Sequence, residues 1–389
     1  MLIKNGEVYM KKYRILHITH ATVGGVAEYI KLFFNNMDRD KYEIYLICPE
    51  NGKLKKDIEA MGINVYPVNI NRDISIKDDI KSLIQISKLI KLIKPNLIHI
   101  HSTKAGILGK VAAFINGVPN IYNPHGWSFS MDVCKIKKYI YALIERYTSL
   151  FCNSIINISE HEYELAKKYR ICKENKLQII HNGIDISKYK NKQFSKSIIL
   201  KELGIPEKSF IVGMVARISE AKDPFKFIRI AKEMCNNNDE IYFVLVGDGE
   251  LKNDIEQAII ENKLENRVII TGWTEEVEKY ISIFDVGILT SRWEGFGLAL
   301  VEYMASLKPV VSTNAGGIKD IIKDKYNGTL IDIHSNEKKF INAIIELKED
   351  KKLRTMYINN GKDMVEKEFN INKVIEEHEK LYNSILTLN

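Results

Sequence analysis

The stretch RILHITHATVGGVAEYIKLFFNNM, residues 14–37, decides how the chain folds. It begins with a short apolar run, passes through a pair of glycines, and continues as a longer amphipathic segment. A strand that is apolar on both faces and is followed by an amphipathic helix is the repeating unit of a parallel sheet with helices on both sides. The stretch therefore predicts an α/β fold.

The same strand–helix unit recurs in two sets. Apolar runs at 42–50, 95–102 and 119–126 continue the first set, and the second set follows at 210–218, 241–249, 267–273, 285–291 and 308–314. The polar, lysine-rich end of the stretch 177–197 is typical of a connector. We therefore predict two doubly wound α/β domains that face a central cleft, with a boundary near residue 190.

The bulk composition agrees with two packed domains. The chain has 389 residues, of which 45% are hydrophobic and 28% charged, and a single core rarely serves such a length. Its five cysteines form no CxxC pair, which favours a reducing compartment. Charges interrupt the apolar residues of the N-terminus, and no run approaches the roughly 18 apolar residues that a membrane span needs. We expect a cytoplasmic protein.

The net charge of +7 suits an anionic small molecule, an anionic membrane surface or nucleic acid. The sequence contains no zinc finger, aromatic RNA-binding consensus or basic tail, so we expect no nucleic-acid partner. In open α/β sheets ligands bind at the carboxyl ends of the strands, and several of the predicted strand-end loops combine glycine with cations. Such loops favour a phosphorylated ligand.

Arg217 and Lys222 share one of these loops. Arginine neutralises a diphosphate through a forked pair of hydrogen bonds, and lysine does so as a movable point charge. The alternative is a pair of solvated loop charges. Gly24 and Gly25 follow the first strand, where backbone can approach a phosphate at a helix N-terminus, although a plain turn explains the pair equally well. The spacing matches neither a dinucleotide fingerprint nor a Walker A loop.

Histidines also gather at predicted strand ends. His125 ends a strand and precedes glycine, so it is either a structural residue or part of the site. His99 and His101 alternate on one face of a strand, and His17 and His20 lie near the end of the first strand. A metal site would need a third ligand with a supporting shell, and the sequence indicates none. We predict no metal.

Two acids, Glu294 and Glu302, frame the stretch EGFGLALVE. Gly295 and Gly297 exclude a continuous helix, so a helix should begin near Leu298. Even a full helix would separate the acids by roughly 12 Å, beyond the roughly 5–9.5 Å of a glycosidase carboxylate pair. They are better suited to holding two parts of an extended ligand, such as a sugar and a ribose, with a diphosphate at the helix N-terminus between them. A capping acid with a solvated helix acid is the alternative.

With these residues the chain resembles the retaining family-4 glycosyltransferases, which have the GT-B fold of two Rossmann-like domains. The resemblance covers nearly the whole chain. It rests most strongly on EGFGLALVE (294–302) followed by KPVVSTNAGGIKDII (308–322), and also on GGVAEYI, NPHGW, HNGID, ARISEAKDP, VGDGE and TGW. It implies an acceptor domain at 1–190, a donor domain at 191–365 and a C-terminal helix at 366–389 that returns to the first domain.

The resemblance also implies roles for the candidate residues. Glu294 would contact the donor sugar, Glu302 the ribose hydroxyls, and Arg217 with Lys222 the diphosphate. We assign the chemical step to His125, Glu294, Arg217 and Lys222. Donor binding is assigned to Gly24, Gly25, Arg217, Lys222, Glu294, Phe296, Gly297, Leu298 and Glu302. The nucleotide sugar is a substrate, and no cofactor is expected.

The implied reaction is transfer of a sugar, with retention, from a nucleoside-diphosphate sugar such as a UDP-sugar. The resemblance is strongest to the branch that builds bacterial capsule, exopolysaccharide and O-antigen repeats on polyprenyl-diphosphate-linked acceptors. Residues 134–151 mix cations with apolar residues and could rest on an anionic membrane, or could form an ordinary helix packed on the sheet. A nucleotide-sugar 2-epimerase and a non-catalytic nucleotide-sugar binding protein are the alternative functions.

Overall fold

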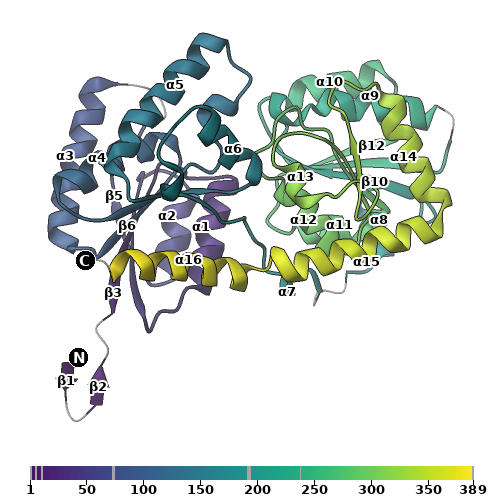
Figure 1. Ribbon diagram of the computed structural model, residues 1–389. Coiled ribbons are helices and arrows are strands. Elements are labelled where there is room, and N and C mark those ends of the chain that lie inside the picture. Colours follow the sequence, from purple (N-terminus) through teal and green to yellow (C-terminus); the bar gives the residue numbers. More distant parts are fainter. Residues whose placement is uncertain are drawn as a thin grey trace. The chain divides into compact units, whose positions relative to one another are not determined.

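The computed structural model describes residues 2–4, 7–9, 12–71, 75–190, 194–236 and 238–387, with side chains from residue 12 onward (Figure 1). The chain divides into two compact units. The first contains Met1–Asn182 together with Ile371–Asn389, and the second contains Gly183–Asn370. The fold class predicted from the sequence, two doubly wound α/β units, is confirmed.

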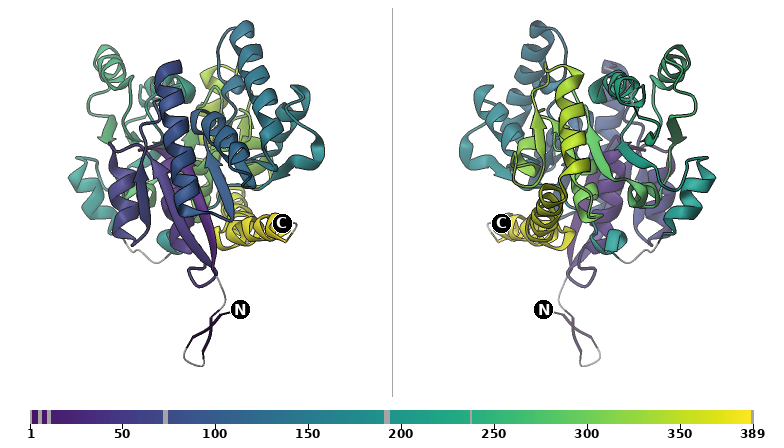
Figure 2. Two further views of the ribbon diagram at one scale, coloured as in Figure 1. Left: turned by 90° about the vertical axis from the view of Figure 1, so that its left-hand side faces the viewer. Right: turned by 90° about the vertical axis from the view of Figure 1, so that its right-hand side faces the viewer.

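The first unit is built on a parallel sheet. Among the described residues its seven strands lie in the order β5-β4-β3-β6-β7-β8-β9, and helices lie on both of its faces (Figure 2). The strands are β3 (Tyr13–Thr19), β4 (Tyr42–Cys48), β5 (Asn64–Pro67), β6 (Leu97–His101), β7 (Asn120–Asn123), β8 (Ser154–Asn157) and β9 (Leu177–Ile179); a separate hairpin pairs β1 (Leu2–Lys4) with β2 (Glu7–Tyr9). The helices are α1 (Gly25–Asn36), α2 (Lys53–Ala60), α3 (Ile76–Ile93), α4 (Thr103–Ile115), α5 (Lys135–Thr148), α6 (Glu160–Lys168) and α16 (Ile371–Leu386), with short 3-10 turns at Ser128–Ser130, Ser149–Phe151 and Glu174–Lys176.

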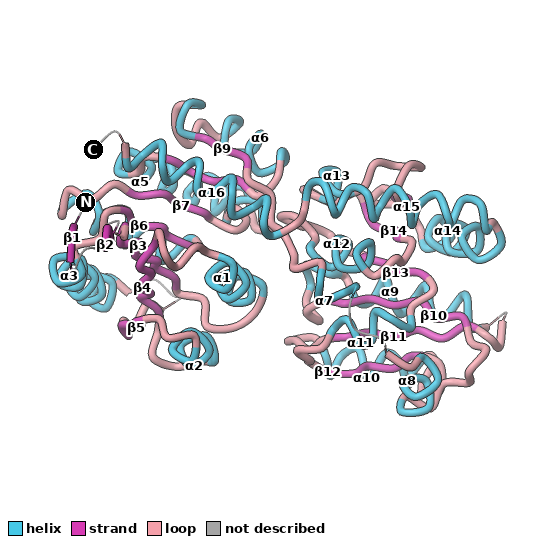
Figure 3. The backbone as a smooth tube through the Cα atoms, turned by 90° about the horizontal axis from the view of Figure 1, so that it is seen from below, coloured by secondary structure: helices cyan, strands magenta, loops and turns pink. Residues whose placement is uncertain are grey.

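The second unit repeats this architecture. Its described strands form a six-stranded parallel sheet in the order β12-β11-β10-β13-β14-β15, and Figure 3 shows β12 to β14 side by side in that order. The strands are β10 (Phe210–Val215), β11 (Ile241–Val246), β12 (Val268–Gly272), β13 (Val286–Leu289), β14 (Val310–Thr313) and β15 (Thr329–Ile331). The helices are α7 (Ser187–Lys190), α8 (Lys196–Glu202), the 3-10 turn η4 (Glu220–Lys222), α9 (Pro224–Cys235), α10 (Lys252–Glu261), α11 (Val277–Ile283), α12 (Leu298–Ala305), α13 (Ile318–Ile321), α14 (Glu337–Glu349) and α15 (Lys351–Glu368).

Each sheet has a topological switch point. In the first unit the chain winds outward from β3 through β4 and β5, then returns to β6 on the other side of β3. In the second it winds from β10 through β11 and β12 and returns to β13 on the other side of β10. A crevice opens beyond the carboxyl ends of the strands at such a point, because neighbouring crossover helices lie on opposite faces.

The spacing of the buried residues of the first helix, α1, explains how it packs on the sheet. Its buried residues Ala27, Tyr29, Ile30, Phe33 and Phe34 recur at helical spacing, so one face of α1 packs on the sheet. The last helix, α16, completes the same core, since its Val374, Ile375 and Tyr382 are buried there. The C-terminal segment therefore belongs to the first unit from Ile371 onward.

The connector differs from the sequence-based expectation. The sequence predicts a boundary near residue 190, whereas the two units separate between Asn182 and Gly183. The reason is α7, which packs on α12 of the second unit and donates a hydrogen bond from the Tyr189 hydroxyl to Glu302 over 2.9 Å. Residues 191–193 of the predicted connector lie outside the described residues. Within the described part of the chain, no helix combines the length and apolarity needed to cross a membrane.

Candidate functional site

The second unit brings Lys222 and Glu294 into contact. Lys222 ends the 3-10 turn that follows β10, and Glu294 lies in the loop that follows β13, so the two side chains meet at the switch point between these strands. The Lys222 ammonium forms an ion pair with Oε2 of Glu294, and the Ser291 hydroxyl donates to the same oxygen over 3.2 Å. A cation and an acid that were assigned to one ligand therefore already neutralise each other.

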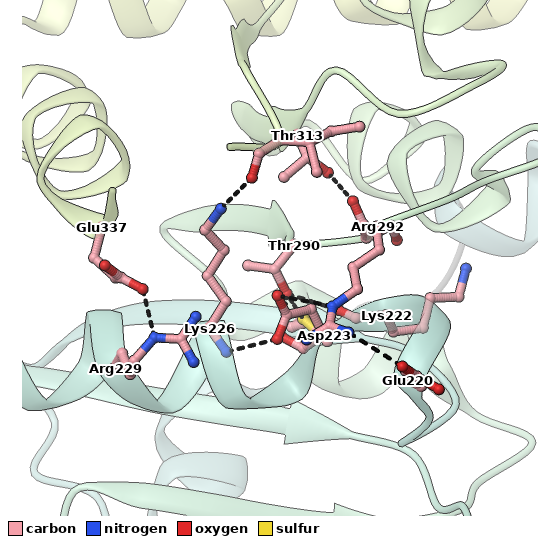
Figure 4. Close-up of polar contacts among 12 residues, drawn as sticks. Glu220, Lys222, Asp223, Lys226, Arg229, Thr290, Arg292, Thr313 and Glu337 are labelled. Carbon is pink, nitrogen blue, oxygen red and sulfur yellow. Dashed lines mark hydrogen bonds and ion pairs between the residues drawn. The ribbon is translucent and has the colours of Figure 1, made fainter. Parts of the chain in front are cut away.

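Backbone and side-chain contacts hold these loops in place. The Arg292 amide donates to the Ala221 carbonyl over 2.8 Å, and the Gly317 amide donates to the Glu294 carbonyl over 3.0 Å. Figure 4 shows Arg292 reaching Asp223 and Glu220, with ion pairs of 3.4 and 3.2 Å, while Lys222 points away from that cluster. Asp223 also caps α9 by accepting from the Lys226 amide. These contacts together fix the positions of the loops.

The glycine between the two acids starts helix α12. Gly297 has φ of +104° and is the N-cap residue, and the helix begins at Leu298 as the sequence predicted. A Cβ at Gly297 would meet its neighbours only at ordinary contact distances of 3.5–3.6 Å, so the left-handed backbone is what requires glycine. Phe296 is buried and packs edge-on against Phe369, with ring centroids 5.4 Å apart. Its aromatic ring therefore anchors the loop.

Glu302 faces inward from α12. Burial raises the pKa of its carboxyl to about 7, and the hydrogen bond from Tyr189 acts in the opposite direction. Lys188 lies close enough to lower the same pKa, and its ammonium pairs with Glu278 at 3.1 Å. The acid predicted to hold a ribose is therefore partly shielded and already bonded by a hydroxyl group.

Arg217 follows β10 and is exposed. Its Nε pairs with Glu250 at 3.0 Å, and 66% of its side chain is accessible. The glycines of the neighbouring VGDGE loop have a packing role, because a Cβ on Gly247 or Gly249 would collide with the backbone carbonyl of Ala216 or Ile218. The β11 loop thus lies directly against the Arg217 loop, which explains why glycine is needed there.

In the first unit, Gly24 and Gly25 lie at the switch point between β3 and β6. Gly24 has φ of +82° and precedes α1, and Gly25 is the first residue of that helix. A Cβ built on either glycine meets no atom within 4 Å. Open space in front of a helix N-terminus is what close approach of a phosphate would require.

His125 lies one strand farther along the same edge. Its φ is +55°, and Ser102 at the end of β6 has φ of +66°. Left-handed backbone at residues other than glycine is strained and collects at functional sites. The Asn123 side chain holds the turn by accepting from the His125 amide over 2.9 Å. Burial lowers the pKa of His125 to about 3, so its imidazole is neutral.

The structure groups more histidines than the sequence indicated. His17, His99 and His101 offer ring nitrogens that all lie within 4.8 Å of one another, so the fold brings together three candidate ligands that the sequence places on two separate strands. The alternation of His99 and His101 is visible in the sequence. The position of His17 opposite His99 is not, because it depends on the tertiary pairing of β3 with β6. Burial lowers the pKa of all three side chains.

Several other contacts were not predicted. Tyr189 lies in the supposed connector, and Ser291 precedes the first acid by three residues; neither carries a signal in sequence without knowledge of its partner. The predicted residues fall into two groups, each at the switch point of its own unit or on the adjoining strand end. Lys222, Glu294, Gly297 and Glu302 gather in the second unit, and Gly24, Gly25 and His125 in the first.

Models of two glycosyltransferase families match the chain. Residues 23–188 match the model described as Glycosyltransferase Family 4, and residues 195–364 match Glycosyl transferases group 1. A galactosyltransferase of Escherichia coli, named UDP-Gal:alpha-D-GlcNAc-diphosphoundecaprenol alpha-1,3-galactosyltransferase, is 31% identical over 95% of this chain and 97% of its own length. The chain therefore belongs to the family-4 glycosyltransferases, and it is an enzyme of that class.

Further relatives agree with this assignment. The capsular polysaccharide biosynthesis glycosyltransferase CapM of Staphylococcus aureus is 26% identical over 97% of this chain and 98% of its own. The crystal structure of Anabaena HepE in complex with UDP-glucose is similar with a TM-score of 0.83 and 22% identity, covering 95% of this chain and 99% of that one. This structural likeness supports the GT-B fold.

Proposed function

We propose that the enzyme transfers a sugar, with retention, from a UDP-sugar to a polyprenyl-diphosphate-linked saccharide in the synthesis of a cell-surface polysaccharide. The observation that carries the proposal is the Lys222–Glu294 pair at the switch point between β10 and β13, beside the N-terminus of α12. The name of the Escherichia coli relative supports both the donor and the lipid-linked acceptor. A neighbour solved with UDP-glucose supports the same donor nucleotide.

In this mechanism the bond between the sugar's anomeric carbon and the diphosphate breaks, and the acceptor hydroxyl oxygen bonds to the same face of that carbon. The hydroxyl proton passes to the departing phosphate. Arg217, Lys222 and the N-terminal amides of α12 would stabilise the charge on the leaving group. Glu294 would hold the sugar and Glu302 the ribose, while Gly24, Gly25 and His125 would contribute from the first unit.

The proposal includes independence from a metal, because cations of the chain would perform the neutralisation. Full activity in EDTA is the expected result, and complete loss that a divalent metal restores would contradict it. The acceptor test is equally direct: UDP should be released at a useful rate only when a lipid-linked saccharide is present. Isomerisation of the donor without acceptor would indicate a 2-epimerase. Binding without turnover on a panel of acceptors would indicate a non-catalytic binding protein.

We also propose peripheral contact with an anionic membrane through α5. This helix buries Ala142 and Glu145, whereas an apolar stripe on another side is exposed, with Ile136 74% and Tyr147 66% accessible. Exposed Lys135, Lys137 and Arg146 accompany it, and a cationic hollow beside Leu150 is lined by Arg146, Arg170, Lys173 and Lys176. Apolar side chains next to cations favour the headgroup region of anionic lipid.

Vesicle flotation tests this contact. The Ile136→Asp and Tyr139→Asp double variant should lose binding to vesicles that contain phosphatidylglycerol, and the native enzyme should bind phosphatidylcholine vesicles poorly. Ile260→Asp is a matched control, because Ile260 is an exposed isoleucine on α10. Equal binding by the double variant and the native chain would exclude α5 as the contact.

A further inference from the structure

Three histidines of the first unit, of which His17 and His101 are buried and His125 is half-buried, form a hydrogen-bonded chain. Nδ1 of His17 lies 2.9 Å from Nε2 of His101, and Nδ1 of His101 lies 3.0 Å from Nε2 of His125. The ring planes of the two pairs are 9° and 21° apart. Because the lone pair of an imidazole lies in its ring plane, such nearly parallel rings can form in-plane N–H···N hydrogen bonds.

The chain has a defined direction. A neutral imidazole carries one N–H donor and one acceptor nitrogen, and burial keeps these rings neutral by lowering the pKa of each. Nε2 of His17 is fully buried and has no hydrogen-bond partner among the described residues. Orphaned buried N–H groups are rarer than orphaned acceptors, so the proton of His17 belongs on Nδ1, where His101 accepts it.

The other two tautomers follow from the first. His101 accepts at Nε2 and must therefore carry its proton on Nδ1, which it donates to Nε2 of His125. His125 then carries its own proton on Nδ1. That nitrogen makes no hydrogen bond to any described residue, and the His125 side chain is only half-buried, so its N–H remains for a ligand.

We propose that His17 and His101 are positioning residues, which hold His125 as the Nδ1–H tautomer so that a neutral imidazole donates a hydrogen bond to an oxygen of the bound nucleotide sugar. The hydrogen bond to the nucleotide sugar rests on the proposed donor-binding role of His125. The assignment of the His125 tautomer does not depend on that role. Tyr29 supports the geometry, because its ring packs edge-on against that of His125 with centroids 4.8 Å apart.

A metal ion bound by His17, His99 and His101 is the rival explanation of the cluster. Both nitrogens of His101 are already used by His17 and His125, so a metal could take His101 only by breaking one of these hydrogen bonds. The rings also pack against Phe33 and Phe34, where a divalent charge without an anionic ligand would be costly. The hydrogen-bonded chain needs no such compensation.

Nitrogen-15 NMR of the full-length enzyme with labelled histidine tests the tautomer directly. The nine histidines are assigned from single variants, and long-range nitrogen–proton spectra show which ring nitrogen carries the proton. The expected result is a protonated Nδ1 in His125 of the native enzyme and a mixture of tautomers in His101→Leu. A proton on Nε2 of native His125 would overturn the proposal, whatever reaction the enzyme catalyses.

Kinetics separate positioning from packing. His101→Leu should lower kcat/KM for the donor about tenfold, as expected for one lost hydrogen bond. His101→Asn keeps an N–H at the position of Nδ1 and should recover most of that loss. His99→Leu is the control, since His99 is equally buried on the same strand but bonds Tyr382 over 2.6 Å. Equal losses at 99 and 101 without rescue, or a stoichiometric metal that disappears in His17→Leu, would refute the positioning role.

Discussion

Lys222 and Glu294 are the residues whose chemistry depends most on each other. Each is less than a quarter exposed, and each neutralises its partner. A diphosphate that approaches Lys222 must share the ammonium with Glu294, while a sugar hydroxyl can donate to the carboxylate that Lys222 holds in place. In the proposed mechanism the pair would therefore couple recognition of the sugar to recognition of the leaving group.

Lys222→Met should reduce turnover strongly. It removes the fixed positive charge that would stabilise the leaving group in the proposed mechanism. Removal of one preorganised donor from such sites costs about 10²–10³ in kcat. It also leaves Glu294 without its cation, so the loss should be smaller when Glu294→Gln is already present. Steady-state rates of both single variants and the double variant measure this coupling. Near-normal rates in both Lys222→Met and Arg217→Ala would show that neither cation takes part in the mechanism.

Glu302 should make folding stability depend on pH. Burial raises the pKa of its carboxyl from 4.5 to about 7, so the folded state binds the proton more tightly than the unfolded state. The contribution to the free energy of unfolding is therefore present below pH 4.5, declines as pH rises to about 7, and is lost above it. The total is on the order of 3 kcal/mol.

Urea unfolding of the native chain and of the Glu302→Gln variant between pH 4.5 and 8 measures the contribution of this carboxyl to the free energy of unfolding. The variant cannot ionise at this position, so the native chain should lose stability relative to it as the pH rises. A constant difference between the two proteins across the range would mean that the carboxyl is ionised throughout. Sequence spacing marked Glu302 as special, but its pKa depends on burial and on Tyr189, which only the folded chain brings together.

At the scale of elements, the apolar runs identified the strands that matter for the site. Strands β3, β4, β6, β7 and β10 to β14 lie where the sequence places them. Each coincides with a run of apolar residues that is bounded by turn residues. The strands that the sequence did not indicate, β1, β2, β5, β8, β9 and β15, have three or four residues. Strands β7, β13 and β14 are as short, with four residues each, so length alone does not separate the two groups. The place of so short a strand is decided by pairing with a neighbour.

Helix α1 offers a test of phosphate approach at its N-terminus. Gly25 has no left-handed backbone, and a Cβ there meets nothing within 4 Å. Gly25→Ala should therefore leave stability unchanged or raise it by about 0.4–1 kcal/mol, while the added methyl weakens binding of UDP. Thermal unfolding and calorimetric titration with UDP separate the two effects. Undiminished affinity for UDP in a folded variant would argue that no phosphate approaches this turn.

At the scale of the whole molecule, the last helix, α16, places the C-terminal end of the chain in the same unit as its N-terminal part. The sequence displays the repeated strand–helix units of both sheets, whose crossovers are right-handed as a rule. The membership of α16 in the first unit is implied only by the family resemblance, because its apolar face alone would suit either core. Tyr382 decides it: the side chain is fully buried, and its hydroxyl bonds Nδ1 of His99 on β6 over 2.6 Å.

Tyr382→Ala should therefore destabilise the first unit selectively. The lost ring contacts and the cavity should cost about 3–5 kcal/mol, by analogy with other large aromatic truncations, and the His99 ring loses its partner. Hydrogen exchange followed by mass spectrometry should show faster exchange in β3 and β6 but unchanged protection in β10 and β13. Ser384→Ala is the control, because Ser384 is exposed on the same helix. Equal loss of protection in both sheets would mean that the two units unfold as one cooperative body, and that α16 stabilises the whole chain rather than the unit it completes.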